Sequence, residues 1–437
     1  MHKKVTMEQY NSNTEHNMSK YIAALDIGTT KVVAIIGEVI TENGQKKINV
    51  LSHGIAPTQG MKRGMINDLG QVIDAIKEAT NKARFKEDFD IEQVYIGVAG
   101  PTVKSQIIKH YKNIPSGTIT EKDIADLQRE VYRTATQDTE IVLHVIPHNY
   151  IIDKQYEHKN PVNIKARQLD GEFHVISADK NFVYSIRQAV QHAGFDTKGI
   201  IFEPLASAEA VLLPEEKEAG VALVDIGGGT TDILIIHDNK IIHSSVIPFG
   251  ADTITEDIRT ALQVLKNVAE EMKIKYGTAI ALKHLDNKTI EIPAISGRTS
   301  RSVKARSIAI IIQSRMVEII DTLNEVIQPY VQNGQLAAGL TITGGGSLLK
   351  DLVPLIKYRT GLDIRLAAPT LTNIEELNKP QFATTQGLIL IGQKMNKKGQ
   401  TASTRKKTKK GKLSNIFGKL KDFADGIFNI EPEDLDE

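Results

Sequence analysis

The sequence predicts an α/β protein built from two duplicated halves, with a small α+β unit inserted into the first half and an amphipathic helix on a flexible C-terminal tether. Three observations lead to this fold class. A strand–turn–strand pattern at residues 24–36 recurs at residues 222–236, about 200 residues later. Residues 102–178 separate a strand and a helix of the first half. A basic stretch near the C-terminus precedes apolar residues at helical spacing.

The composition indicates a folded protein of more than one unit. The 437 residues exceed the usual length of one domain, 41% of them are hydrophobic, and 24% are charged. The absence of cysteine excludes disulfides and thiolate metal sites. No leader-like segment and no apolar run near 18 residues occurs, so we expect a soluble, cytosolic body. Residues 1–19 are polar and aperiodic and are predicted to be a disordered extension.

The repeated pattern is typical of a tight β-hairpin. Each copy has an apolar run, an aspartate near its end (Asp26 or Asp225), a Gly/Thr turn and a second apolar run. Such a turn has little side chain in the way, so its N–H groups can approach a polyphosphate. The aspartate would face the same anion, which requires a cation between them, and Mg²⁺ binds through one or two carboxylates plus phosphate oxygens. One such turn also occurs in ordinary hairpins, so the prediction rests on its repetition.

Two common nucleotide motifs are missing. The sequence has no G-x-x-x-x-G-K-[ST] and no G-x-G-x-x-G, so neither a P-loop nor a dinucleotide fingerprint is present. We therefore expect the nucleotide to bind between the two halves.

Glu203 is the candidate residue for orienting a water molecule. It follows the apolar run at residues 199–202 and precedes Pro204, which suits the first turn of a helix. A carboxylate at this strand-to-helix junction can position an attacking water. The alternative is an exposed acid at a helix start.

Two further segments are candidates for contact with the nucleoside. Residues 341–349 read as a strand, a glycine turn and a helix start, where glycines would let the backbone pack against a flat adenosine. Glu270 and Lys273 lie three residues apart on a predicted helix at residues 264–276 and so share a face. They could bracket the ribose and the adenine edge. The alternatives are a purely structural turn and a surface ion pair.

The predicted elements also locate the insertion. Only residues 57–67 separate the strand at residues 48–56 from the helix that begins at Asp68, which leaves no room for a subdomain there. The insertion instead lies between the strand at residues 93–100 and the helix at residues 179–192. It contains a predicted helix and two strands, which make a small α+β unit; their ranges are 121–134, 141–153 and 172–176.

The C-terminal region predicts a tethered amphipathic helix. Nine Lys or Arg and no acid lie between Lys394 and Lys412, so residues 393–412 should form a flexible basic linker. Residues 413–428 are predicted as a membrane-targeting helix, followed by an acidic tail at 429–437. Alternatives are docking on the protein's own body or on a partner, and a nucleic-acid arm, for which no apolar stripe is needed. The stripe comprises Leu413, Ile416, Phe417, Leu420, Phe423, Ile427 and Phe428.

The order of motifs D-x-G-T-T, E-P, D-I-G-G-G-T-T-D, E-x-x-K and G-G-G-S resembles the actin, Hsp70 and sugar-kinase ATPase superfamily. The resemblance implies two RNase H-like halves that bind ATP, with Asp26 and Asp225 holding a hydrated Mg²⁺ and Glu203 polarising the water. Glu203, Asp26 and Asp225 are thus the candidate catalytic residues. The implied nucleotide contacts are Gly28, Thr29, Thr30, Lys31, Gly227, Gly228, Gly229, Thr230 and Thr231 for the phosphates, Glu270 and Lys273 for the nucleoside, and Gly344, Gly345, Gly346 and Ser347 for the adenosine.

The relocated insertion and the tethered helix resemble the FtsA family of bacterial cell-division proteins, as do the phrases at residues 54–66 and 202–212. The resemblance implies an actin-like protein that forms head-to-tail filaments with itself on anionic membrane lipid. It also implies tethering of the FtsZ ring to the cytoplasmic face of the cell membrane at the mid-cell septum, and recruitment of later divisome proteins. The enzyme status stays open, with a slow Mg-dependent ATPase as the upper limit.

The same resemblance divides the chain into subdomains. Residues 258–329 form subdomain 2B, which should receive the FtsZ C-terminal peptide on basic residues beside the apolar run at residues 307–312. The alternative is a solvated basic face. The candidate contacts are Arg301, Lys304 and Arg306. The other subdomains are 1A (20–101 and 179–219), 1C (102–178) and 2A (220–257 and 330–392).

Two rival functions belong to the same superfamily. An Hsp70-like ATPase would carry a substrate-binding β domain after the ATPase, but few residues follow Gly392. A small-molecule kinase would need an acidic base in the cleft and no membrane tail. The predicted amphipathic helix disfavours it.

Overall fold

The protein is described by a computed structural model that covers residues 21–42, 45–292 and 300–404. The predicted N-terminal extension, the membrane-targeting helix and the acidic tail lie outside the described residues. Two five-stranded sheets form the centre of the molecule, and their strand orders are β11-β6-β1-β2-β3 and β14-β13-β12-β17-β18. In both, an antiparallel hairpin is extended by parallel strands. The predicted duplication is therefore confirmed at the level of topology.

The first sheet is buried because its strands are apolar on both faces. Strand β1 is buried from Ile22 to Ile27, and helices α1 (Leu69–Lys82) and α3 (Lys180–His192) pack beside the sheet. Asp68 caps α1 by accepting a hydrogen bond from the Gln71 N–H. The strands are β1 (Tyr21–Ile27), β2 (Lys31–Glu42), β3 (Gln45–Pro57), β6 (Gln93–Val98) and β11 (Asp196–Phe202), with a short hairpin of β4 (Met61–Lys62) and β5 (Met65–Ile66).

The second sheet repeats this arrangement with its own hydrophobic core. Its register places Asp225 of β12 directly opposite Asp232 of β13, and beside Thr343 of the parallel strand β17. Opposite residues of an antiparallel pair lie on the same face. The strands are β12 (Val221–Ile226), β13 (Thr231–His237), β14 (Lys240–Ile247), β17 (Leu340–Thr343) and β18 (Ile364–Leu366).

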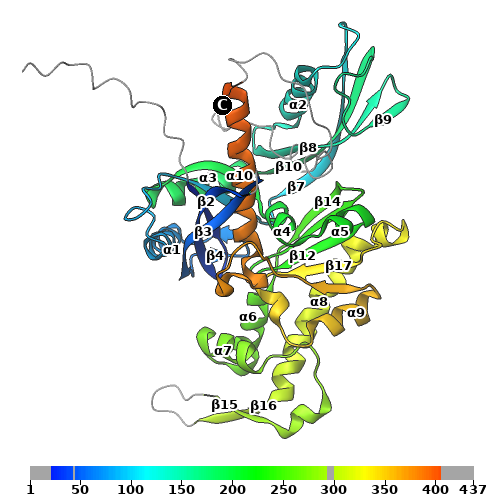
Figure 1. The fold of residues 1–437 in the computed structure, drawn as a ribbon. Coiled ribbons are helices and arrows are strands. Elements are labelled where there is room, and N and C mark those ends of the chain that lie inside the picture. The colour runs from blue at the N-terminus through cyan, green and yellow to red at the C-terminus, as the bar shows by residue number, and fades with distance from the viewer. Residues whose placement is uncertain (1–20, 43–44, 293–299, 405–437) are drawn as a thin grey trace, which may run out of the picture.

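Helix α10 (Ala383–Thr404) packs on the first half, chiefly against α4 (Glu203–Val211) and β1 (Figure 1). A Cβ on Gly387 would lie 1.8 Å from the Ala206 carbonyl oxygen, so the missing side chain allows this close packing. The placement differs from the predicted division, which assigned residues 330–392 to the second half. Residues 393–404, predicted as the start of a flexible linker, continue the helix. Within this continuation, Lys394 pairs with Glu209 of α4 at 2.7 Å.

The insertion forms a separate α+β unit with its own core, as predicted. Its sheet has the order β7-β10-β8-β9, and α2 (Glu121–Ala135) covers one face. Thr120 and Asp123 form a capping box at the start of α2. Two strands were not predicted: β7, which is largely exposed, and the short β9. The strands are β7 (Lys104–Asn113), β8 (Glu140–Ile152), β9 (Tyr156–His158) and β10 (Gln168–Asp179).

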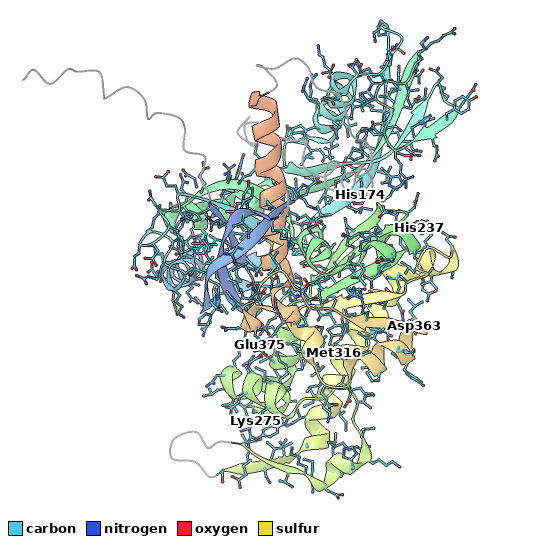
Figure 2. The ribbon with its side chains drawn as sticks, in the orientation of Figure 1. His174, His237, Lys275, Met316, Asp363 and Glu375 are labelled. Carbon is cyan, nitrogen blue, oxygen red and sulfur yellow. The ribbon has the colours of Figure 1, made fainter. Side chains whose placement is uncertain are left out.

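The insertion also contacts edge strand β14 of the second half. The Ser105 hydroxyl donates to the Ser244 carbonyl at 2.8 Å, and His174 Nε2 lies 3.1 Å from Ser244 Oγ. Figure 2 labels His174 at this boundary. Burial lowers the pKa of His174 to about 3, so the imidazole is neutral at physiological pH. The insertion thus joins the two halves on one side.

Helices α6 and α7, the β15–β16 hairpin and the start of α8 form the end of the molecule opposite the insertion, whereas α5 and α9 lie beside the second sheet (Figure 1). The long helix α8 is buried along one side, including Met316, which Figure 2 labels. No helix among the described residues is long and apolar enough to cross a bilayer. The elements are α5 (Pro214–Ala219), α6 (Ala251–Leu262), α7 (Lys266–Tyr276), β15 (Thr289–Ile292), β16 (Arg301–Lys304), α8 (Ala305–Gln332) and α9 (Leu352–Thr360), with short 3-10 turns η1 (Lys283–Asn287), η2 (Gly345–Leu348), η3 (Glu375–Leu377) and η4 (Pro380–Phe382).

Candidate functional site

The two glycine-containing turns meet at one cavity between the halves. Each turn is closed by the same bond: the Gly28 N–H donates to the Lys31 carbonyl at 3.0 Å, and the Gly227 N–H to the Thr230 carbonyl at 2.9 Å. The turns touch, since a Cβ on Gly229 would lie 2.2 Å from Thr29 Oγ1. Only glycine permits this approach.

The cavity draws its wall from both halves. It has a volume of about 110 Å³ and is partly open to solvent. Its wall comprises Asp26, Ile27, Gly28, Thr29, Thr30, Lys31, Gly64, Ala99 and Glu203 from the first half and Asp225, Gly227, Gly228, Gly229, Thr230, Asp232, Gly344, Gly345, Pro380, Gln381 and Thr384 from later in the chain.

Four carboxylates lie in this wall with one ammonium among the described residues, that of Lys31. Burial, reinforced by the neighbouring carboxylates, holds the pKa of Glu203 and of Asp232 well above their usual values. Burial also raises the pKa of Asp26, and it raises the pKa of Asp225 to about 6. The pKa of Lys31 is lowered by burial, against the attraction of Asp26 and Asp225. Too little positive charge therefore balances the four acids.

Hydrogen bonds hold the aspartates and the lysine in place. The Thr385 hydroxyl donates to Asp26 Oδ2 at 2.8 Å, and the Ser207 hydroxyl donates to Asp225 Oδ2 at 2.6 Å. Lys31 Nζ donates to the Gln381 carbonyl at 3.0 Å and lies 4.2 Å from the centre of the Phe382 ring.

Glu203 lies where the sequence predicted it, at the first residue of α4 with Pro204 beside it. Strand β6 passes so close that a Cβ on Gly97 would lie 2.9 Å from Glu203 Cγ. The alternative of an exposed helix-start acid does not fit this position, because the carboxyl group belongs to the cavity wall.

Asp232 is a site residue that sequence reasoning placed in the stretch lining the cleft, residues 225–232, but did not name individually. Its side chain is 5% exposed, and among the described residues its Oδ1 atom has no hydrogen-bond partner. The signal was the motif D-I-G-G-G-T-T-D itself. Its two aspartates are symmetric about the turn, so a hairpin places them opposite each other on one face.

The acids fit a hydrated cation that is bound mostly through a ligand. In the described part of the chain, no group of three or more acidic or histidine side chains is close enough to hold a metal alone. Mg²⁺ keeps most of its waters and uses one or two carboxylates plus phosphate oxygens. The unpartnered Asp232 oxygen and the raised pKa values of its neighbours indicate that positive charge is needed here.

The glycine turn after β17 reaches the cavity only in part. Gly344 and Gly345 line it, whereas Gly346 packs against Ile226 and Ser347 is buried with its hydroxyl donating to the Gly344 carbonyl at 2.6 Å. Gly344 has φ +85°, and a Cβ there would lie 2.2 Å from Asp225 Oδ1.

Glu270 and Lys273 do not line the cavity. Their side chains pair at 2.8 Å, and Lys273 Nζ also donates to the Ala251 carbonyl at 3.0 Å and to Thr255 Oγ1 at 2.8 Å. These bonds hold α7 against α6. These bonds lie behind the second glycine turn, because the start of α6 contacts that turn: the Ala251 N–H donates to the Gly227 carbonyl at 3.0 Å.

The basic residues of the second half differ in their surroundings. Arg301 donates to the backbone carbonyls of Leu262 and Gln263 at the end of α6. Arg306 pairs with Asp286 at 2.9 Å, while Lys304 precedes α8 and is exposed.

Comparison with known families and relatives adds to this geometry. Residues 222–387 match the model of the family "Cell division protein FtsA", and residues 100–177 match "SHS2 domain inserted in FTSA". The chain is 34% identical to the cell division protein FtsA of Neisseria meningitidis serogroup B over 85% of this chain and 89% of that one. It is 30% identical to FtsA of Escherichia coli K12 over 89% and 94%.

Solved structures share the fold. The type IV pilus PilM-PilN complex matches with a TM-score of 0.61 at 19% identity, over 85% of this chain and 98% of that one. MreB5 of Spiroplasma citri bound to ADP matches with a TM-score of 0.53 at 16% identity, over 87% and 99%. The predicted actin-like fold class is confirmed.

We predict that Asp225→Asn removes a pH dependence of stability. A carboxyl whose pKa is about 6 when folded and near 3.8 when unfolded binds more protons in the folded state between these values. Its contribution is complete below the unfolded pKa and is lost as pH rises through 6. Denaturation without nucleotide or Mg²⁺ should show the wild type losing on the order of 2 kcal/mol relative to Asp225→Asn between pH 4 and pH 7. Asp74→Asn, at an exposed aspartate of α1, is the control; a parallel pH response of wild type and Asp225→Asn would contradict the prediction.

We predict that Gly344→Ala is markedly destabilising. The added Cβ meets Asp225 Oδ1 in a backbone conformation reserved for glycine, so the loss should be about 3 kcal/mol, of which about 1 comes from backbone strain and about 2 from crowding. Gly334→Ala controls for backbone strain, because φ is +69° there but nothing lies within 4 Å. If urea denaturation shows that Gly344→Ala lowers the free energy of unfolding no more than Gly334→Ala does, the prediction that crowding against Asp225 destabilises the variant is contradicted.

Proposed function

The chain belongs to the FtsA family of cell division proteins, and from this premise we propose that it binds Mg-ATP between its two halves and links FtsZ to the cytoplasmic face of the cell membrane during septum formation. The observation that carries the nucleotide part is the pair of matched turns that face one acid-lined cavity. Polyphosphate binding requires open backbone N–H groups and a balancing cation. The turns would supply such N–H groups, and the carboxylates of the cavity wall would hold the cation through its waters.

Different residues would bind the phosphates, the cation and the adenosine. The turn residues Thr29, Thr30 and Gly227 to Thr231, with the Lys31 ammonium, would bind the phosphate oxygens. Asp26 and Asp225, with Asp232 beside them, would hold Mg²⁺ through its waters. The cation, when bound, neutralises charge that develops on the phosphates. Gly344 and Gly345 would flank the adenosine, whereas Gly346 and Ser347 support the turn from behind.

Hydrolysis by this arrangement would be slow at most. Glu203 is the residue placed to orient a water, but burial and three nearby acids hold its pKa well above the usual value. A cation bound beside the aspartates would oppose this shift. We propose that ATP acts mainly as a bridge between the halves, and that the bound state matters more than turnover.

The membrane part of the proposal rests on the sequence beyond Thr404. The basic residues from Arg405 to Lys412 and the apolar stripe at residues 413–428 suit adsorption to an anionic lipid surface. One such helix binds weakly. Head-to-tail filaments of this chain would present many copies at once, and linked weak anchors bind with avidity.

The partner part of the proposal concerns subdomain 2B. Lys304 is exposed at the start of α8, where it could meet a short acidic and apolar peptide such as the FtsZ C-terminus. Arg301 and Arg306 contribute positive charge nearby, although both are engaged within the subdomain. Later divisome proteins would join the assembled filament.

We predict nucleotide-dependent binding to anionic vesicles. The full chain should sediment with them, and more so with Mg-ATP, because filaments multiply the anchor. The control chain should end at Thr404, because ending at Gly392 would remove the Lys394–Glu209 and Tyr95–Asn396 contacts of α10. That control should stay in the supernatant, as should the full chain with neutral vesicles. Equal sedimentation of both chains, or of neither, would contradict the proposal.

We predict that Lys304→Glu weakens binding of the FtsZ C-terminal peptide by about tenfold, equivalent to ~1.4 kcal/mol. Reversing this exposed charge leaves the backbone contacts of α6 intact, whereas changing Arg301 would break them. Fluorescence anisotropy with labelled peptide measures the affinity. Lys77→Glu on the exposed side of α1 is the control, and unchanged affinity in Lys304→Glu would remove this residue from the binding surface.

A further inference from the structure

Helix α10 contacts the key aspartates of both halves through two consecutive residues. The Thr385 hydroxyl donates to Asp26 Oδ2 at 2.8 Å, and the Thr384 hydroxyl donates to Asp225 Oδ2 at 3.3 Å. Both threonines lie in the first turn of the helix. A single rigid element thus touches two carboxylates that are 199 residues apart in the sequence.

Ser207 of α4 completes a buried hydroxyl cluster with Thr384 and Thr385. Its hydroxyl donates to Asp225 Oδ2 at 2.6 Å and lies 2.9 Å from Thr384 Oγ1. Because a hydroxyl has one proton, and that of Ser207 goes to Asp225, the Thr384 proton is shared between Asp225 and Ser207. Ser207 and Thr385 are fully buried, so water does not replace these donors.

The cluster acts on the charge and the orientation of the aspartates. Donors to a carboxylate favour its ionised form and oppose the effect of burial on the pKa. All three hydroxyls use Oδ2, which leaves Oδ1 of Asp26 and of Asp225 for a water of the cation. Loss of groups that orient metal ligands in this way typically lowers metal affinity by roughly ten- to hundredfold.

The threonines are held in position by the rest of α10. Gly387 lies against the backbone of Ala206, and Gly392 lies against the Tyr95 ring. Further along, the Tyr95 hydroxyl donates to Asn396 Oδ1 at 2.9 Å. The first turn of the helix therefore cannot shift without disturbing contacts on the first half.

We propose that Thr384 and Thr385 are positioning residues for the cation site, and that from the first turn of α10 they set the orientation and separation of Asp26 and Asp225. The proposal rests on the proposed binding of Mg-ATP. It assigns to α10 a role in the site that the glycine and aspartate motifs do not reveal.

The test compares the full chain with Thr384→Val/Thr385→Val, in which shape is kept and both donors are lost. Fluorescent ATP-analogue binding is titrated with Mg²⁺ and repeated in EDTA, and unfolding is measured separately. Positioning predicts that the Mg²⁺ concentration for half-maximal binding rises about tenfold or more, and that the loss of affinity relative to the wild type is much smaller in EDTA than at low Mg²⁺. The conservative Thr384→Ser/Thr385→Ser should restore the wild-type Mg²⁺ dependence, because it restores the donors.

Control variants distinguish a failure of the positioning role from a failure of the proposed function. Thr322→Val removes a similar hydroxyl on α8, which donates to the Glu318 carbonyl at 3.0 Å, and should change nothing. An unaltered Mg²⁺ requirement in the valine variant, or failure of the serine variant to restore it, would overturn the positioning role and leave the proposed function standing. A wild-type chain that binds no nucleotide at any Mg²⁺ concentration would overturn both. If the valine variant is unfolded, the single Thr385→Val variant is used in the same titration, with the same criteria.

Discussion

Electrostatic imbalance in one buried cavity is the constraint on which the other features of the site depend. Asp26, Glu203, Asp225 and Asp232 share that space, and the Lys31 ammonium cannot neutralise them all. Two features reduce this imbalance. The pKa values of the acids are raised, and the hydroxyls of Ser207, Thr384 and Thr385 donate hydrogen bonds to the aspartates. Without a bound cation, the buried carboxylates of such a site lack enough positive charge to balance them. A cation with a polyphosphate would satisfy both the acids and the open turns.

The duplicated hairpins create this cavity because each brings an aspartate and a glycine turn to the same edge of its sheet. Elements added to the repeat then connect the halves. Helix α10 follows the second sheet in sequence but packs on the first, and the insertion belongs to the first half but bonds to β14 of the second. These two connections join the halves in addition to the touching turns and the Ser207–Asp225 hydrogen bond.

Local patterns predicted the parts of the site that depend on local geometry. The hairpins, Glu203 at its strand-to-helix junction and the glycine turn at Gly344 all follow from short-range rules about strands, turns and helix starts. The spacing of Glu270 and Lys273 correctly indicated a shared helix face. It could not indicate that Lys273 also donates to Ala251 and Thr255 of α6, and contact of the pair with a nucleoside stays a prediction.

The features that sequence reasoning missed depend on tertiary packing. Asp232 became a site residue through its register with Asp225, and Thr384 and Thr385 through the crossing of α10 to the first half. Strand β7 was missed because its largely exposed side chains alternate only weakly in polarity. The basic composition after Lys394 suggested a linker, but α10 continues to Thr404, and Lys394 and Asn396 contact Glu209 and Tyr95.

Proton release on binding of Mg-ATP tests the central claim most directly. If the buried acids hold protons until a cation arrives, calorimetry in buffers of different ionisation enthalpy should detect their release. With a pKa of about 6 for Asp225, the wild type should release about half a proton more per bound nucleotide at pH 6 than Asp225→Asn does, and the difference should vanish by pH 8. Normal binding with equal proton release in the two proteins would show that the cation does not bind beside these carboxylates, and would contradict the account.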